Sequence, residues 1–480
     1  VVSSVVVENS NNNSSCQDRK TVDVNEVSEM WIQDKWLKAS IYDRSETQVG
    51  ATIAGPALVF ESYSATFIPN DWNGSINGSG SLILKHNVNL PSDYSKKHSS
   101  IRLELFVNSF TNIAKEMGTL LQRTAISTNV KERLDFSCAL LDRHGNLIVN
   151  APHIPVHLGA LGLCVRSVMD VLKMRPGDTV MTNHPKFGGS HLPDITLISP
   201  VFVESQLIGF VASRSHHAEL GGIRPGSMPP NARFLYEEGV VIEPMYVVKS
   251  GRANWDKVRL LLNARPYPSR SIDNNIADIR AALAANARGI SGLESLAKRY
   301  GLDDFKNFIN LLWVESSLGV KNALRKLGDG IYSAKENLDD GTPILVNVDV
   351  RDGNALFDWT GTGDVHLGNL NATPAIVRSA VLYVLRIMVK EALPLNEGMM
   401  ENVKIKLPSP SLLSPDFRKD TLEVPAVTGG NVETSQRLVS VLLRAFGLCA
   451  GSQPTMNNIL FGTENFGYYE TVCGGAGAGP

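Results

Sequence analysis

The sequence predicts an α+β protein in which a multi-layer unit of mixed helices and strands follows a small β-rich module. Three observations support this class. Short apolar runs separated by Gly and Asn fill residues 41–84, a pattern typical of compact β structure. Apolar residues recur at helical spacing over residues 101–127. The apolar runs 195–203 and 207–212 are separated by three polar residues, which predicts a β-hairpin.

Four segments are expected along the chain. Residues 1–20 are rich in Ser and Asn and are expected to be disordered or variable. Residues 21–86 form the β-rich module, and the polar stretch 87–100 is expected to be a linker. Residues 101–480 are expected to form the larger unit, truncated at its C-terminus. Because the sequence begins without Met and ends within a Gly-rich stretch, we expect a fragment of a longer protein.

Helical and strand patterns alternate within the larger unit. Helices are predicted over residues 101–127, 158–172, 274–299, 305–327, 375–389 and 432–446. The third of these is expected to break at Gly289. Strand pairs are predicted at 136–141 with 147–150 and at 344–350 with 355–360, each joined through a turn that contains Gly.

Composition excludes several classes of function. A chain of 480 residues, 43% of them hydrophobic, is long enough to bury more than one core. The formal net charge of -2 gives no electrostatic reason to bind nucleic acid. The five cysteines are scattered without a C-x-x-C pair, which argues against a disulfide framework and fits a reducing, cytoplasmic compartment. No apolar run approaches the roughly 20 residues of a membrane-spanning helix, so no membrane partner is expected.

The predicted hairpin organises the candidate site. Counting equal steps back from its turn places Asp194 opposite residues 215–217. His191, Asp194, His216 and His217 would then meet at the open end of the hairpin. Imidazoles and a carboxylate brought together suit either a divalent metal or acid/base chemistry. A set of ordinary loop histidines would show the same pattern.

Several motifs, taken in order, carry a resemblance to a known family. They are residues 131–140, 151–159, 188–194, 216–217, 225–230, 368–371, 429–431 and 468–471. Through them, residues 101–480 closely resemble the hydantoinase B/oxoprolinase family. Residues 31–84 resemble the end of the partner hydantoinase A unit. Both parts in one chain resemble the fused, ATP-dependent 5-oxoprolinase branch of the family.

The resemblance implies a reaction in which the lactam ring of 5-oxo-L-proline is hydrolysed to L-glutamate while ATP is converted to ADP and phosphate. A five-membered lactam is a stable amide, and phosphorylation of its carbonyl oxygen would activate the carbon toward water. By resemblance, ATP and Mg²⁺ bind mainly to the hydantoinase A-type domain, most of which is absent here. No G-x-x-x-x-G-K-[ST] motif supports a separate ATP site in this chain. The fragment alone is expected to be inactive.

Other interpretations remain open. The substrate is alternatively N-methylhydantoin or a related cyclic amide, and the chain is alternatively a non-catalytic fragment that lacks the ATP domain. A homodimer is expected by resemblance only.

Resemblance to the large subunit of acetone carboxylases implies that His191, Asp194 and His216 bind a divalent metal. Two imidazoles and one carboxylate with open positions suit Mn, Fe or Zn. Such a metal would polarise an oxygen or lower the pKa of water. The alternative is that the same residues bind substrate or position water without a metal.

Three further histidines are candidates for catalysis. His217 follows a predicted ligand directly, so on a strand it would point to the opposite side; it is either a general base or a packing residue. His153 and His157 lie four residues apart, but Pro155 makes a regular helix unlikely. Their loop is either functional or structural.

Arg133 and Asp135 are the remaining catalytic candidates. They flank a single residue at strand spacing, and they either pair with each other or use the arginine to bind the substrate carboxylate. Three residues depart from the family pattern: Glu219, Ala282 and Pro454 replace a usual Asp, Gln and small residue. These departures bear on the identity of the substrate more than on the fold.

Overall fold

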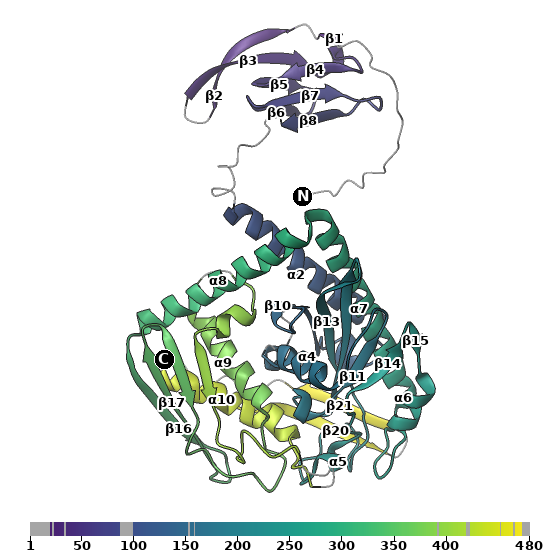
Figure 1. The fold of residues 1–480 in the computed structure, drawn as a ribbon, viewed down its shortest axis with the longest axis vertical. Coiled ribbons are helices and arrows are strands. Elements are labelled where there is room, and N and C mark those ends of the chain that lie inside the picture. Colours follow the sequence, from purple (N-terminus) through teal and green to yellow (C-terminus); the bar gives the residue numbers. More distant parts are fainter. Residues whose placement is uncertain are drawn as a thin grey trace. The chain divides into compact units, whose positions relative to one another are not determined.

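The structure, a computed structural model, divides into two compact units, Val1–Ser99 and Ser100–Pro480 (Figure 1). It describes residues 20–21, 24–32, 35–86, 99–151, 154–157, 159–390, 393–418, 423–451, 453–463 and 466–472. The class is α+β, as predicted. The predicted disordered segment and most of the predicted linker lie outside the described residues.

The described part of the first unit consists of β-strands and one 3-10 turn, Arg44–Glu46. One four-stranded sheet has the order β1 (Lys20–Thr21), β4 (Ala51–Ala54), β7 (Trp72–Ile76) and β8 (Leu82–His86). The other has the order β2 (Glu26–Ile32), β3 (Lys35–Asp43), β5 (Ala57–Phe60) and β6 (Ala65–Ile68). Alternating residues such as Ile53 and Val59 are buried in a shared apolar cluster. Side chains along a strand alternate between its two faces, which is why short apolar runs separated by Gly turns predicted this β module.

A seven-stranded sheet forms the centre of the second unit. Its strands, in spatial order, are β10 (Leu147–Asn150), β9 (Phe136–Asp142), β13 (Gln206–His216), β12 (Asp194–Val203), β11 (Thr179–Thr182), β14 (Met245–Lys249) and β15 (Arg252–Ala253). Neighbouring strands are antiparallel. Both predicted strand pairs in the larger unit are confirmed.

Helices cover both faces of this sheet. On one face, α2 (Ser99–Thr124) and α7 (Ile272–Tyr300) pack against residues such as Leu197. On the other, α4 (Ala160–Val171) packs against residues such as Ile198. Because both faces are covered, β12 and β13 are buried along most of their length, and their sequence reads as continuous apolar runs rather than alternating ones.

The predicted break at Gly289 is wrong, because α7 continues through it. A Cβ at this position would lie 2.4 Å from the Sδ of Met117, on α2. The glycine therefore permits a close approach of the two helices, and their packing offsets the low helix propensity of Gly.

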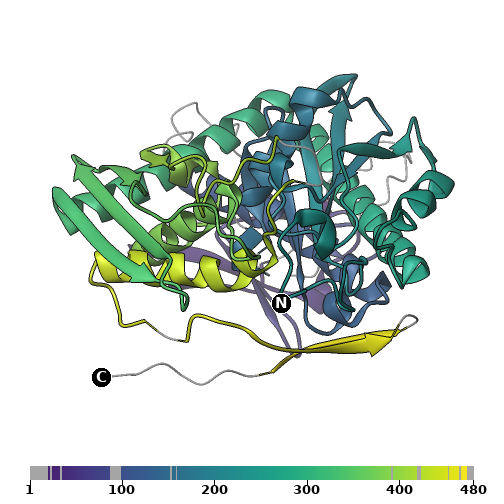
Figure 2. The ribbon, with the colours of Figure 1, turned by 90° about the horizontal axis from the view of Figure 1, so that it is seen from below.

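A second layer lies beside the central sheet (Figures 1 and 2). Its four-stranded sheet has the order β16 (Gly330–Asn337), β17 (Pro343–Arg351), β18 (Asn354–Asp358) and β19 (Val403–Lys406). Helices α8 (Leu302–Leu327), α9 (Pro374–Met388) and α10 (Ser435–Ala445) share an apolar cluster with it. The prediction missed β16, in which no side chain is fully buried and Ile331 is exposed.

Shorter elements connect these layers. They are α3 (Thr128–Lys131), a 3-10 turn (Pro155–His157), another (Pro185–Phe187), α5 (Leu235–Glu238), α6 (Trp255–Leu262), a 3-10 turn (Glu397–Met400) and a π-helical turn (Gly430–Thr434). The last strands, β20 (Asn457–Thr463) and β21 (Phe466–Val472), form a hairpin at the edge of the unit (Figure 2). Among the described residues, no helix is both long and apolar enough to cross a membrane.

Candidate active site

The hairpin of β12 and β13 brings the two parts of the site together. The strands turn through Glu204 and Ser205, whose positive φ values of 51° and 65° suit a tight hairpin turn. Asp194 lies directly opposite His216 in the register. The predicted juxtaposition of these two residues is therefore confirmed.

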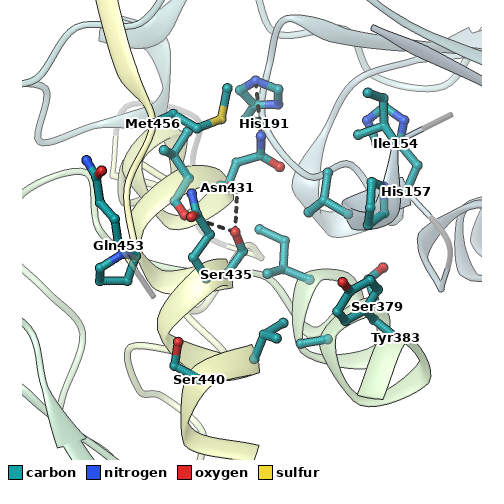
Figure 3. A pocket seen from close by; sticks show the side chains of 18 of the residues that line it. Ile154, His157, His191, Ser379, Tyr383, Asn431, Ser435, Ser440, Gln453 and Met456 are labelled. Atoms are coloured by element: carbon teal, nitrogen blue, oxygen red, sulfur yellow. Dashed lines mark hydrogen bonds between the residues drawn. The ribbon is translucent and has the colours of Figure 1, made fainter. Parts of the chain in front are cut away.

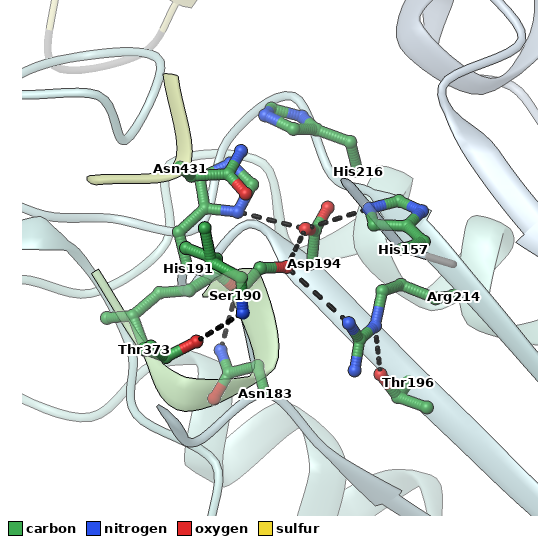
Figure 4. Close-up of polar contacts among 12 residues, drawn as sticks. His157, Asn183, Ser190, His191, Asp194, Thr196, Arg214, His216, Thr373 and Asn431 are labelled. Atoms are coloured by element: carbon green, nitrogen blue, oxygen red, sulfur yellow. Dashed lines mark hydrogen bonds and ion pairs between the residues drawn. The ribbon is translucent and has the colours of Figure 1, made fainter. Parts of the chain in front are cut away.

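Asp194 is the centre of a buried polar network (Figure 4). Its Oδ2 accepts a hydrogen bond of 2.6 Å from Ser190 Oγ and lies 3.0 Å from both His157 Nε2 and His191 Nδ1. Burial would raise the pKa of Asp194, but the two imidazoles outweigh burial and hold that pKa well below its usual range. The carboxylate is therefore ionised, and its Oδ1 is buried with no hydrogen-bond partner among the residues that the structure describes.

A fully buried arginine is connected to this network by hydrogen bonds. Arg214, on β13, donates from Nε to Thr196 Oγ1 at 2.8 Å and from Nη2 to the carbonyl oxygen of Gly188 at 2.9 Å. Its Nη1 reaches Ser190 Oγ at 3.5 Å, one hydrogen bond away from Asp194. These hydrogen bonds hold in place the segment that carries Ser190.

The three imidazoles around Asp194 differ in what their ring nitrogens contact. His157 uses both, because its Nδ1 lies 3.0 Å from Ser137 Oγ and its Nε2 contacts Asp194. His191 directs Nδ1 toward the carboxylate, in an electrostatic contact rather than a well-aligned hydrogen bond. Its Nε2 lies 3.5 Å from the amide nitrogen of Asn431 at the cavity. His191 therefore has its Nε2 at the cavity.

His216 completes the cluster from the opposite strand. Its ring centroid lies 5.0 Å from that of His191, and its Nδ1 lies 2.8 Å from Asn129 Nδ2. Burial lowers the pKa of His216 to about 4, although the nearby Asp135 carboxylate acts in the opposite direction. The ring is therefore neutral near pH 7.

A cavity of about 850 Å³ opens in front of these residues (Figure 3). Its polar end contains Arg133, Asp135, His157, His191, Asp194 and His216. Its opposite wall comes from α9 and α10, with apolar side chains such as Ile376 and Val439 beside hydroxyls such as Tyr383 and Ser435. Apolar lining with a few convergent polar groups is typical of sites for small molecules.

Residues 133–135 form a turn rather than the strand that their spacing predicted. Arg133 and Asp135 both line the cavity, but Leu134 has a φ of 54°, so the three residues do not form a strand. The reason is a turn closed by a 2.9 Å hydrogen bond from the Asp135 amide to the carbonyl oxygen of Asn129. The prediction that these residues have strand spacing is wrong, but both side chains line the cavity.

His217 lies on the other side of the sheet. It is fully buried, and its Nδ1 lies 3.1 Å from Asn275 Oδ1 on α7 rather than beside the cavity. The expectation that it points away from His216 is confirmed. Burial lowers the pKa of His217. His153, the remaining predicted histidine, lies outside the described residues.

Four residues of the site were not predicted: Asn129, Ser190, Arg214 and Asn431. Ser190 adjoins His191 within a motif that was recognised, so its proximity was a usable signal. Arg214 lies on β13, which is buried over most of its length, and a charged residue is rarely buried without a partner, so its position was a usable signal. Asn431 depends on a close approach of distant segments: a Cβ on its neighbour Gly430 would lie 1.9 Å from the carbonyl oxygen of Asn371.

The departures from the family pattern occupy three different environments. Glu219 accepts hydrogen bonds from the amides of Gly221 and Gly226 and pairs with Arg270 Nη1 at 3.0 Å. Ala282 is buried in the core between α7 and the sheet. Pro454 lines the cavity. Of the three, only Pro454 is placed to contact a substrate.

The arrangement does not form a ready metal cage. Among the described residues, no group of three or more His, Cys, Asp or Glu side chains is arranged to hold a metal ion. The Asp194 Oδ2 is shared instead among Ser190, His157 and His191. The predicted metal ligands therefore fit a hydrogen-bonded network, and we derive no chemical step through a metal.

This chain is similar to proteins of one known family. Residues 99–480 match the family model described as Hydantoinase B/oxoprolinase. The 5-oxoprolinase of Saccharomyces cerevisiae is 41% identical over 482 residues, which cover 94% of this chain and 37% of the yeast protein. This chain thus spans little more than a third of that relative.

Two solved structures share the fold. The ATP-dependent caprolactamase from Pseudomonas jessenii superposes with a TM-score of 0.65 at 26% identity, covering 72% of this chain and 60% of that one. A nucleotide-free acetone carboxylase gives a TM-score of 0.65 at 17% identity, covering 74% and 48%. The second likeness extends to the fold alone.

Proposed function

This chain belongs to the Hydantoinase B/oxoprolinase family, and we propose that it supplies the hydrolytic part of an ATP-dependent cyclic amide hydrolase. The substrate we propose is 5-oxo-L-proline, opened to L-glutamate. The 41% identity to a 5-oxoprolinase over nearly the whole chain supports that choice. The resemblance to an ATP-dependent caprolactamase supports the wider class of lactams.

One observation carries the proposal: a buried, ionised Asp194 contacts Nδ1 of His191, whose Nε2 is at the cavity. A carboxylate on one ring nitrogen favours the proton there and leaves the lone pair on the other. That arrangement makes a general base. The contact is loosely aligned here, as catalytic hydrogen bonds often are before substrate binds.

The proposed step begins with a water molecule between His191 Nε2 and the activated carbonyl carbon. His191 takes one proton as the water oxygen bonds to carbon, which gives a tetrahedral centre. The C–N bond then breaks as the new hydroxyl loses its proton, and the proton on His191 passes to the departing ring nitrogen. The product is an open-chain acyl phosphate, which a second water molecule hydrolyses to L-glutamate and inorganic phosphate. Arg133 and His216, at the same end of the cavity, are placed to bind the negative charge on the substrate oxygens.

ATP would bind to a part of the complete protein that this chain does not contain. The yeast relative is almost three times as long as the matched region, and the long, fused relatives support an association with a hydantoinase A-type domain. That domain would phosphorylate the lactam carbonyl and so create the activated carbon. A homodimer and a cytoplasmic location remain predictions.

The test uses the complete protein. With ATP, it should convert 5-oxo-L-proline to L-glutamate and release stoichiometric phosphate, while this 480-residue chain alone should not. N-Methylhydantoin serves as the alternative substrate. Faster turnover of N-methylhydantoin would replace the proposed substrate, and absence of substrate-dependent ATP hydrolysis with either compound would favour a non-catalytic role.

Metal ligation by His191, Asp194 and His216 is the second candidate. The buried Asp194 Oδ1 that lacks a partner is the observation in its favour. Elemental analysis of the purified protein beside its His191→Ala variant separates the two. A stoichiometric Mn, Fe or Zn content that the variant loses would support metal ligation. Equal or negligible content in both would support the acid/base proposal.

A further inference from the structure

The cavity extends beyond the reacting residues, along one face of the helix that follows Asn431. Asn431 lies at the polar end, with its Nδ2 3.5 Å from Nε2 of His191 (Figure 3). Ser435, Val439 and Leu443 follow at intervals of four residues, and all of them line the cavity. Residues at this spacing share one face of a helix, and residues 431–443 at about 1.5 Å each make that face about 18 Å long.

Helix α9 forms the second wall. Ile376, Ala380, Tyr383 and Ile387 line the cavity at intervals of three or four residues, so they share one face of α9. The two helices pack in one apolar cluster. We call the space between these two faces the α9–α10 groove. Because Ile387 is 51% exposed, the groove opens to solvent at this residue.

The groove is larger than the proposed substrate requires. 5-Oxo-L-proline is a single five-membered ring with one carboxylate, and its reacting carbonyl must lie beside His191 at the polar end. The cavity of about 850 Å³ is in the upper part of the range of about 300–1,000 Å³ that is typical of sites for drug-sized ligands. The remaining space lies along α9 and α10, where a group attached to the lactam can reach it.

The described side chains of the α9–α10 groove are uncharged. Of the described carboxylates and guanidinium groups that line the cavity, those of Arg133, Asp135 and Asp194 all lie at the polar end. The groove is lined by apolar side chains such as Leu443 and by neutral polar ones such as Tyr383. A charged group buried there would lose its hydration without gaining an ionic partner. The groove therefore suits an uncharged group that is mainly apolar and able to form a hydrogen bond.

We propose that the α9–α10 groove is a subsite for an uncharged, apolar substituent on the lactam, and that the complete protein also opens the rings of 5-oxo-L-prolyl amides of apolar amines. The inference deepens the proposed function, on which its chemistry rests. In these amides the substituent is attached on the other side of the ring nitrogen from the reacting carbonyl, so it can extend away from His191. The ring C–N bond breaks as in 5-oxo-L-proline, with the same two water molecules and one ATP. The amide outside the ring is kept, and the product is the corresponding α-amide of L-glutamate.

The first test measures binding and does not depend on turnover. The complete protein, without ATP, is titrated in a calorimeter with two neutral ligands, the N-methylamide and the N-benzylamide of 5-oxo-L-proline. We expect the benzylamide to bind at least about tenfold more tightly, because burial of its phenyl group stabilises the complex by that factor or more. Equal affinities, or binding of neither amide, would overturn the proposal.

Substitutions on α10 test where the phenyl group binds. Ser440 lines the cavity next to Val439, so Ser440→Phe places a ring in the groove. The advantage of the benzylamide over the methylamide should then fall to about twofold or less, because the space for its phenyl group is filled. Arg444→Phe is the matched control, since it adds the same ring to α10 at a side chain that is 66% exposed, and it should keep the advantage. An unchanged advantage in Ser440→Phe would overturn the proposal.

A second substitution keeps the test decisive if Ser440→Phe does not fold, as judged by circular dichroism. Leu443→Ala removes an apolar contact from the groove without adding bulk. It should also lower the advantage of the benzylamide, since less apolar surface is buried with the phenyl group. An unchanged advantage in a folded Leu443→Ala variant would place the phenyl group outside the groove and overturn the proposal.

The last test measures turnover in the complete protein with ATP. The benzylamide should give L-glutamate α-benzylamide, identified by mass spectrometry, together with phosphate. If 5-oxo-L-proline is hydrolysed while the bound benzylamide is not opened, the additional activity is overturned. If neither compound is hydrolysed, the proposed function fails, whereas the ratio of the two affinities still decides whether the groove is a subsite.

Discussion

His216 and His217 are neighbours in the sequence, yet they belong to two different buried networks. His216 lies with Asp194 and His191 at the cavity, and His217 lies with Asn275 against α7. The alternation of side chains at the end of β13 separates them. Both rings are buried, and burial lowers the pKa of each. Burial and residue type therefore do not distinguish a histidine at the cavity from one packed against α7.

The two networks differ in what their carboxylates contact. Glu219, behind the sheet, is bound by two backbone amides and by Arg270, so its hydrogen bonds close within the protein. Asp194 contacts imidazoles that border an open cavity. The network at the cavity retains unsatisfied capacity for a ligand, whereas the one around Glu219 stabilises a loop.

The largest effect is expected from Asp194→Asn. The amide would remove the negative charge that orients His191 and would present an NH₂ group to imidazole nitrogens. We expect kcat of the complete protein to fall by about 10³-fold or more, within the range known for acid/base groups. Steady-state assays with 5-oxo-L-proline and ATP measure it. A fall of less than about tenfold would show that the cavity network is not the catalytic one.

The matching substitution in the network around Glu219 is Glu219→Ala. Removing this carboxylate leaves Arg270 and two amides without their acceptor, so we expect a loss of about 2–4 kcal/mol in the free energy of unfolding. Because Arg270 is partly exposed, the loss should be below that of a fully buried pair. Denaturant unfolding measures it, and kcat per folded molecule should stay within about threefold. A larger loss of kcat would show that the network around Glu219 also affects catalysis.

A third buried carboxylate, that of Glu238, has no cationic partner within the described part of the chain. Burial raises the pKa of Glu238 to about 8, although the amides of Thr428 and Val427 donate to its Oε1. The folded chain therefore holds a proton that the unfolded chain releases near pH 4.5. The corresponding stability is complete below about pH 4.5 and is lost as the pH rises toward 8.

Glu238→Gln removes this titration and keeps an acceptor for the two amides. We expect the variant to lose less stability than wild type between pH 4.5 and 8, measured by denaturant unfolding across that window. Glu104→Gln is the control, because this carboxylate is exposed. Parallel curves for Glu238→Gln and wild type would contradict a buried, protonated Glu238.

The smallest effect concerns access to the cavity. Cys449 is exposed and lines the cavity, while Cys138 and Cys164 are buried, and burial raises the pKa of Cys138 to about 12. Among these three, a maleimide should modify Cys449 alone, and mass spectrometry identifies the site. Substrate should slow the reaction. Equal labelling of Cys138 would show that the sheet opens more readily than its packing indicates.

The sequence predicted the parts of the site that depend on local pattern. The apolar runs on either side of a short turn placed Asp194 opposite His216, and strand alternation separated His217 from it. Residues 133–135 were misread because a turn closed from Asn129 has the same spacing as a strand. Arg214, Asn129 and Asn431 were missed because each acts through contacts between distant segments, which no local period records.

The most direct test makes the same His→Gln substitution in each of two networks, the one at the cavity and the one against α7. His191→Gln and His217→Gln are made in the complete protein, and L-glutamate formation from 5-oxo-L-proline and ATP is measured beside the melting temperature. We expect His191→Gln to lower kcat by about 10³-fold at nearly unchanged stability, and His217→Gln to lower stability with kcat per folded molecule within about threefold. The reverse result, with activity lost in His217→Gln and retained in His191→Gln, would contradict it.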